Sequence, residues 1–115
     1  MTLLDSFASV FRVLGDPTRL EMLGLLRIRD ICVCEFVQLF DLSQPSISQH
    51  LHRLKEAGLV TGHRRGMWVL YRLAEDLPPV VTAALDALPR PLPREERLRA
   101  MDSDMVCAAV SGMGR

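Results

Sequence analysis

The break at residues 41–45 is the feature that most constrains how this chain can fold. Asp41, Leu42 and Ser43 interrupt a helical pattern, and Pro45 follows, a residue that an α-helix accepts only in its first turn. Ser43 is a favourable N-cap, so a new helix is predicted to begin there. Two helices joined by such a short turn, the second with a polar outer face, form the pattern of a helix-turn-helix. The apolar positions of the two helices are Ile31, Phe36, Val37 and Phe40 before the break, and Ile47, Leu51 and Leu54 after it.

Three helix starts are also predicted upstream of the break. Apolar residues recur at helical spacing from Leu3 to Leu14, which predicts an amphipathic first helix. Asp16 and Pro17 form an N-cap and first-turn proline, and the second helix that they open is apolar almost all round. Such a helix is expected at the centre of the core, and Asp30 is expected to cap the third helix.

The chain changes its periodicity after the helix-turn-helix. Residues 59–61 and 68–71 are β-favouring runs separated by basic residues and Gly66, which predicts a hairpin. A hairpin directly after a recognition helix is a wing, and a short last helix is expected from Pro78. The predicted fold class is mainly α with a small β-hairpin, a dimeric winged helix-turn-helix.

Length and composition favour one small domain that associates with itself. The chain has 115 residues and is 49% apolar, which is more apolar surface than a core of this size needs. The apolar faces of the first helix and of residues 81–88 predict a homodimer. Residues 1–88 are predicted to form the DNA-binding and dimerisation domain, and residues 89–115 a Pro-rich spacer and flexible C-terminal tail.

No apolar run approaches the roughly 18 residues of a membrane span, and the first residues do not resemble a signal peptide. The expected location is therefore cytoplasmic, with no membrane partner. In that compartment three cysteines favour thiol chemistry or metal binding over structural disulfides.

Charge is distributed unevenly along a chain whose net charge is zero. Between Ser43 and Leu73 five basic residues stand against one acidic residue, Glu56. A neutral protein with one basic segment fits a compact DNA-binding face, although a solvated basic surface would have the same composition.

The candidate DNA contacts lie on the outer face of the helix after Ser43 and at the tip of the hairpin, except His50, which is expected at the edge of the buried stripe as a packing or phosphate-contact residue. Glutamine pairs with adenine edges, arginine with guanine or phosphate, and serine with several partners. The alternative is that Gln44 and Ser46 only cap the helix and that the tip arginines are solvated. The candidate residues are Gln44, Ser46, Gln49, His50, His52, Arg53, Arg64 and Arg65.

Cys32 and Cys34 are the candidate metal-binding residues. Side chains two positions apart on a regular helix point about 200° apart, so they chelate one ion only at an extended helix start. Binding of a soft ion is therefore expected to require or cause distortion of the first turn of the third helix. Because that helix braces the recognition helix, the distortion gives a route to DNA release. The alternatives are two buried structural cysteines or a strained disulfide.

The order of these motifs resembles the arsenic-repressor (ArsR/SmtB) family of winged-helix metalloregulators. The matching pieces are FRVLGDPTRLEMLGLL, ICVCEF, LSQPSISQHLHRLKEAGLV and a wing ending in WVLYRL, which together cover roughly residues 7–73. The resemblance implies a dimeric, metalloid-responsive transcriptional repressor of arsenical resistance that binds an inverted-repeat operator in double-stranded DNA. It further implies that arsenite or antimonite, As(III) or Sb(III), acts as the inducer that releases the DNA, and no cofactor is required.

The chain departs from this family pattern at two places. Some arsenic-sensing relatives carry a third cysteine where this chain has Val37, and the remaining cysteine here is Cys107, a candidate third ligand or a bystander. Relatives that sense zinc place histidine and acidic ligands on the last helix, where residues 76–88 contain no histidine. The N-terminal arm also lacks the extra cysteines that cadmium- and lead-sensing relatives use. The absence of these cysteines and of the histidine favours arsenite or antimonite.

Other functions remain open at this stage. The chain is not expected to be an enzyme, because a small thiol redox enzyme would need a βαβ context that the sequence lacks. A winged-helix repressor that senses cadmium, lead or zinc, or a DNA-binding protein that senses nothing, is compatible with the same motifs.

Overall fold

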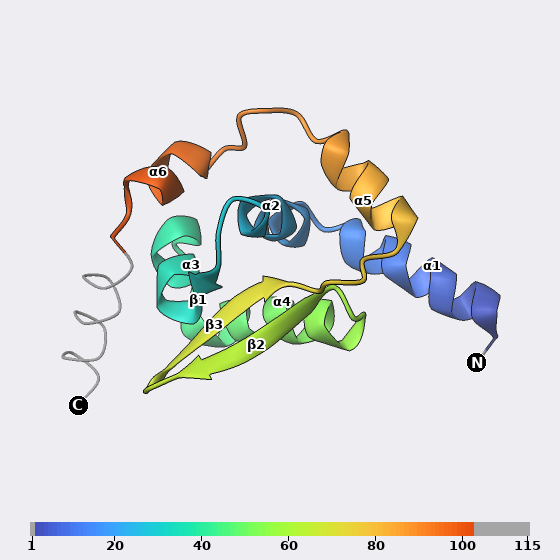
Figure 1. The fold of residues 1–115 in the computed structure, drawn as a ribbon, viewed down its shortest axis with the longest axis horizontal. Helices are drawn as coiled ribbons and strands as arrows, with labels where there is room; N and C mark the ends of the chain where they lie inside the picture. The colour runs from blue at the N-terminus through green and yellow to red at the C-terminus, as the bar shows by residue number, and fades with distance from the viewer. Residues whose placement is uncertain (1, 103–115) are drawn as a thin grey trace.

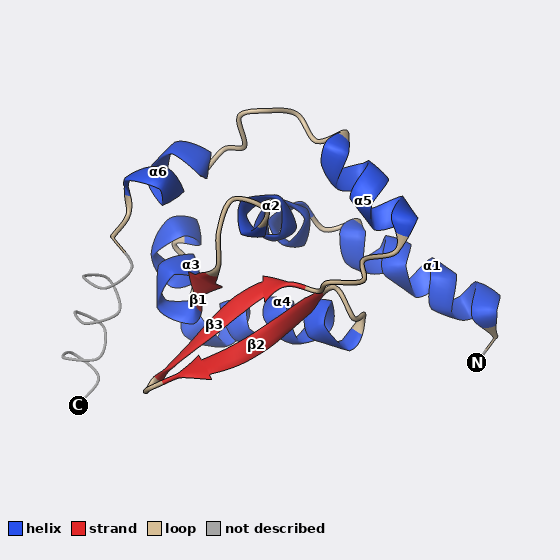
Figure 2. Ribbon diagram, viewed as in Figure 1, coloured by secondary structure: helices blue, strands red, loops and turns tan. Residues whose placement is uncertain are grey.

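The computed structural model describes residues 2–102, which form six helices and a small three-stranded sheet whose hairpin lies at one side of the molecule (Figures 1 and 2). The helices and strands are α1 (Leu3–Leu14), α2 (Pro17–Leu26), β1 (Ile31–Cys32), α3 (Val33–Phe40), α4 (Gln44–Glu56), β2 (Val60–Arg65), β3 (Trp68–Leu73), α5 (Pro79–Asp86) and α6 (Glu95–Ala100). The predicted fold class, mainly α with a winged helix-turn-helix, is confirmed.

The joint between α1 and α2 is fixed by the motif at residues 14–19. The Asp16 side chain caps α2 by accepting a hydrogen bond from the Arg19 backbone N–H at 3.1 Å, with Pro17 in the first turn. The Arg19 Nε donates to the Val13 carbonyl at 2.9 Å, so the same segment also ties the end of α1 to α2. Helix α2 is central, as its all-round apolar sequence predicts, with Met22, Leu23 and Leu25 fully buried.

The sheet has the order β1-β3-β2, and both pairings are antiparallel. Strands β2 and β3 form the predicted hairpin, which turns at Gly66 with a φ of 64°, a conformation that favours glycine. Strand β1 was not predicted from the sequence. It pairs Ile31 with Tyr71 and Cys32 with Leu70, so the segment before α3 is bonded to the wing.

The prediction that Asp30 caps the third helix is wrong. The N-cap of α3 is Cys32, and the Asp30 carboxylate instead pairs with Arg72 on β3 at 2.9 Å. The cause is the pairing of β1 with β3, which holds Ile31 and Cys32 extended and delays the helix to Val33.

The segment predicted to be a spacer is packed against the core over its described part. Leu92 and Leu98 are buried, and the Arg94 guanidinium lies 4.5 Å from the centre of the Phe40 ring. Arg94 also pairs with Glu21 of α2 through Nη1 at 2.7 Å and through its backbone N–H at 2.7 Å. A division between residues 88 and 89 remains a prediction, but residues 92–98 are anchored to α2 and α3.

No helix within residues 2–102 is long and apolar enough to cross a membrane.

Candidate thiol site and nucleic-acid interface

Helix α4 presents a polar face because its apolar stripe is fully buried. Ile47, Leu51 and Leu54 are each 0% exposed, and Ser43 caps the helix by accepting from the Ser46 N–H at 3.3 Å. Of the candidate DNA contacts on this helix, Gln44, Gln49, His52 and Arg53 are exposed, whereas Ser46 and His50 are half-buried.

The two histidines of this helix have partners within the chain. His52 lies 3.1 Å from Glu56 one turn further along the helix. The His50 Nδ1 lies 3.4 Å from Nη1 of Arg19, a contact between α4 and α2. His50 therefore contacts the joint between α1 and α2 through Arg19, and its role at DNA, like that of the other candidates, remains a prediction.

The wing carries two exposed arginines at its tip. Arg64 and Arg65 stand opposite Val69 and Trp68 in the register of the hairpin, next to the turn, and both are exposed. Arg72 lies at the other end of β3, and its charge is compensated by Asp30 at 2.9 Å. The basic character of the wing is therefore concentrated at the tip, where phosphate contact is geometrically simplest.

Cys32 and Cys34 lie close together, one at the end of a strand and the other in the first turn of a helix. Cys32 ends β1 in an extended conformation, with φ −89° and ψ 162°, and Cys34 is the second residue of α3. Their Sγ atoms are 2.6 Å apart, longer than the roughly 2.05 Å of a disulfide, and neither cysteine is in a disulfide. Cys32 is 1% exposed and Cys34 is half-buried, so solvent reaches the pair from the side of Cys34.

This geometry corrects one expectation from the sequence. The helix need not unwind to bring the sulfurs together, because Cys32 lies outside the helix. The strand-to-helix junction already turns both side chains toward one point.

Glu35 holds the junction in place and was missed by the sequence reasoning. Its side chain is 0% exposed, accepts from the Cys32 N–H at 3.0 Å, and forms a bidentate pair with Arg29 at 2.6 and 3.3 Å. The signal was available, since an acid three residues after an N-cap is the capping-box position. Because its buried charge is paired, Glu35 is a positioning residue for the Cys32 backbone.

An apolar pocket opens beside Cys34. It has a volume of about 260 Å³ and lies between the start of α3, the first residue of α4 and the wing. Its lining residues are Val33, Cys34, Val37, Gln44, Met67, Trp68 and Val69.

Cys107, the candidate third ligand, lies outside the described residues. Within residues 2–102 no group of three histidine, cysteine or acidic side chains is placed to hold a metal ion. Val37, at the position where some relatives have their third cysteine, is instead part of the pocket wall.

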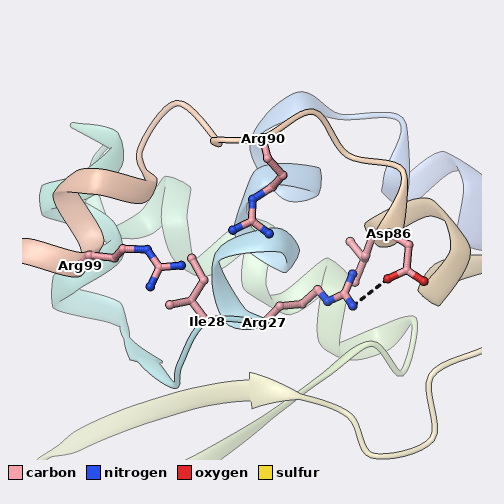
Figure 3. A pocket seen from close by; sticks show the side chains of 6 residues that line it. Arg27, Ile28, Asp86, Arg90 and Arg99 are labelled. Atoms are coloured by element: carbon pink, nitrogen blue, oxygen red, sulfur yellow. Dashed lines mark ion pairs between the residues drawn. The ribbon is translucent and has the colours of Figure 1, made fainter.

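A second hollow, of about 420 Å³, lies between the end of α2, α5 and α6 (Figure 3). Three arginines line it, but each has a carboxylate partner: Arg27 pairs with Asp86 at 2.8 Å, and Arg90 and Arg99 pair with Glu95 at 2.8 and 3.2 Å. The hydrogen bond from Arg90, together with one from the Leu92 backbone N–H, lowers the pKa of Glu95 to about 2. Arg27 therefore ties the end of α2 to α5, and Arg90 and Arg99 fix the Glu95 side chain at the start of α6.

Comparison with known proteins agrees with this geometry. Residues 16–61 match the model of the bacterial regulatory protein arsR family. The arsenical resistance operon repressor of Escherichia coli is 40% identical over 67% of this chain and 67% of its own length. The chain belongs to the ArsR family.

Two further relatives bear on the ligand. The arsenic resistance transcriptional regulator ArsR1 of Pseudomonas putida is 47% identical over 66% of this chain, and the match spans 60% of that relative. The HTH-type transcriptional repressor SmtB of Mycobacterium tuberculosis is 45% identical over 64% of this chain and 54% of its own length. The ArsR family member thus shares its domain with an arsenic regulator and with a repressor named SmtB, over little more than half of each.

Solved structures show the same fold. Reduced HlyU from Vibrio cholerae superimposes with a TM-score of 0.63 at 27% identity, covering 71% of this chain and 83% of HlyU. The homodimeric winged helix-turn-helix DNA-binding domain Mb0332 from Mycobacterium bovis gives a TM-score of 0.63 at 30% identity, covering 73% of this chain and 75% of that domain.

Proposed function

We propose that this ArsR family member is a metalloid-responsive repressor, released from operator DNA when As(III) or Sb(III) binds the thiolates of Cys32 and Cys34. One observation carries the proposal. The thiols of Cys32 and Cys34, neither of them in a disulfide, converge where β1, which is paired with the wing, meets α3, the helix that braces the recognition helix. Arsenic regulators among the relatives support this choice of inducer.

The junction connects the thiols to both DNA-binding elements. Cys32 is paired with Leu70 in β3 of the wing, and Cys34 belongs to α3, which packs against α4. An ion held by both sulfurs ties these two backbones together. Any shift at the junction therefore changes the position of the wing relative to the recognition helix. Because DNA binding needs both elements in place at the same time, such a shift weakens it.

A homodimer supplies the second recognition helix. Leu3, Leu4, Phe7 and Phe11 of α1 are 90%, 76%, 52% and 49% exposed, an apolar face that the described chain does not cover. A second copy would cover it and would place two recognition helices to read an inverted repeat. The homodimeric domain of similar fold supports this arrangement.

Metalloid selectivity follows from the donor set. Thiolates select soft ions, and trivalent arsenic favours three sulfurs, so Cys107 of the same or the partner chain is a candidate third ligand. A sensor of cadmium, lead or zinc is the second candidate function, favoured by the similarity to the repressor SmtB.

Operator binding measured by fluorescence anisotropy, with and without arsenite, tests the proposal. The wild type is expected to release DNA on arsenite addition. The double variant Cys32→Ser/Cys34→Ser should bind the same DNA and retain it. Cys107→Ser is the matched thiol control. If this variant releases DNA at the same arsenite concentration as the wild type, Cys107 is not a ligand, and if release needs a higher concentration, Cys107 is a ligand.

The alternatives give different results in the same assay. Release by cadmium, lead or zinc but not by arsenite would replace the proposed inducer. Retention of DNA under all ions would indicate a DNA-binding protein without a sensor. Release of DNA by arsenite from the double cysteine variant would show that the thiol site is wrong.

A further inference from the structure

The thiol pair leaves one position of a three-coordinate arsenic without a ligand from the described residues. As(III) forms three bonds, and Cys32 and Cys34 provide two sulfurs on one side. The pocket opens beside Cys34 and has that residue, but not Cys32, as part of its wall. The third substituent of a bound arsenic atom would therefore point toward, or into, this pocket.

The wall of the pocket is suited to an apolar substituent. Five of its seven residues are valine, methionine or tryptophan, and Gln44 is the amide at its edge. A hydroxyl placed there loses hydration with few partners to replace it, whereas a hydrocarbon group gains by leaving water. The volume of about 260 Å³ exceeds the roughly 150 Å³ of an engineered apolar cavity that binds benzene.

We propose that the preferred inducer is a trivalent arsenical carrying one apolar organic substituent, which lies in the pocket while Cys32 and Cys34 bind the arsenic. This inference rests on the proposed function and narrows its ligand. The arsenical R–As(OH)2 forms two As–S bonds and loses both hydroxyls. Each hydroxyl leaves as water with one thiol proton, and arsenic stays trivalent throughout.

The substituent would also touch both DNA-binding elements. Gln44, the first residue of α4, lines the pocket, as do Met67 in the hairpin turn and Trp68 and Val69 at the start of β3. A group between them separates the recognition helix from the wing. The organic part of the ligand thus strengthens release of DNA beyond what the arsenic atom achieves at the junction.

Trp68 provides a direct binding signal, because it is the only tryptophan of the chain and lines the pocket. In a Cys107→Ser background, its fluorescence is titrated with arsenite and with phenylarsine oxide, which hydrates to the R–As(OH)2 form. Loss of two free thiols, measured with a chromogenic disulfide reagent, confirms ligation by the pair. Phenylarsine oxide is expected to quench Trp68 and to bind at least tenfold more tightly than arsenite.

Phenylarsine oxide binds many dithiols, so the decisive comparison is between variants. Val37→Phe fills the pocket and leaves both cysteines in place. It should reduce the phenyl-to-arsenite affinity ratio at least tenfold, with arsenite binding changed less than twofold. Met67→Ala shortens a side chain of the pocket wall. Because Met67 is 71% exposed, the variant should fold normally, and its phenyl-to-arsenite affinity ratio should fall three- to tenfold.

The outcomes separate this inference from the proposed function. An unchanged ratio in both variants would overturn the pocket assignment while leaving arsenite sensing intact. A pocket-dependent phenyl response without any arsenite response would support the assignment and refute the inorganic inducer. If arsenite with glutathione binds as tightly as the phenyl compound and Val37→Phe abolishes both, the pocket accepts a thiol and the inference is wrong. Absence of thiol loss with either arsenical refutes both proposals.

Discussion

The salt dependence of operator binding should depend on the two arginines at the wing tip. Arg64 and Arg65 are exposed beside the hairpin turn and form no ion pair within residues 2–102, whereas Arg72 is paired with Asp30 at 2.9 Å. The tip arginines are therefore free to replace counterions on DNA phosphates, and Arg72 contributes less than its formal charge. The perturbation is Arg64→Gln/Arg65→Gln, which removes two charges per protomer and keeps the side chains polar.

The magnitude follows from counterion release. Each phosphate contact contributes about −0.9 to the slope of log affinity against log salt, so losing four contacts in a dimer reduces the slope by about 3.6. Between about 50 and 200 mM salt, the wild type should therefore lose about 150-fold more affinity than the double variant. Arg64→Gln alone should change the slope by about half as much.

Fluorescence anisotropy of labelled operator across this salt range measures both slopes. Arg97→Gln on α6 is the matched single-charge control, since α6 and the hairpin lie on opposite sides of α2 (Figure 1). Its slope should equal that of the wild type. Equal slopes for the wild type and the double variant would refute the assignment of the wing tip as a phosphate contact.

Three further predictions concern stability and assembly. Arg94→Ala should lower the free energy of unfolding, measured by chemical denaturation, by about 2 kcal/mol. This loss is below the roughly 3–5 kcal/mol expected for breaking a fully buried ion pair, because the Arg94 side chain is 36% exposed. The control Arg97→Ala should change the free energy of unfolding by less than about 0.5 kcal/mol. A loss no greater than that of the control would contradict the pairing with Glu21. The stability contributed by the lowered pKa of Glu95 is present above its ordinary value of 4.5 and is lost as pH falls toward about 2. Circular dichroism during acid titration should therefore show that Glu95→Gln loses less stability than the wild type between pH 4.5 and about 2. An equal loss of stability in the two proteins would count against the arginine contacts. Leu4→Asp should shift the sedimenting species from dimer to monomer at micromolar concentration, and an unchanged mass would exclude α1 from the interface.

Local sequence signals were sufficient for the helix-turn-helix. Ser43 and Pro45 act within one turn of the helix that they begin, and Ile47, Leu51 and Leu54 recur at the helical period, so burial of that face follows from spacing alone. The same reasoning predicted α1, α2, α5 and the hairpin. It also placed Gln49 and His52 on the outer face, because the side of a helix opposite its buried stripe faces outward.

The thiol site depended on contacts between distant parts of the chain. Cys32 is extended because it pairs with Leu70, and a two-residue strand has too little sequence pattern to be recognised before its partner is known. Without that strand, the pair falls on a regular helix and its sulfurs point apart.

The sequence by itself determined which elements form and which residues carry sulfur and positive charge. Tertiary structure decided where these groups meet: the sulfurs at one junction, Met67 and Trp68 beside Cys34 across the pocket, and Arg94 on α2 and α3. The physical reason is range. Helix caps and periodicity are local along the chain, whereas strand pairing, buried ion pairs and pocket walls arise from residues that only folding brings together.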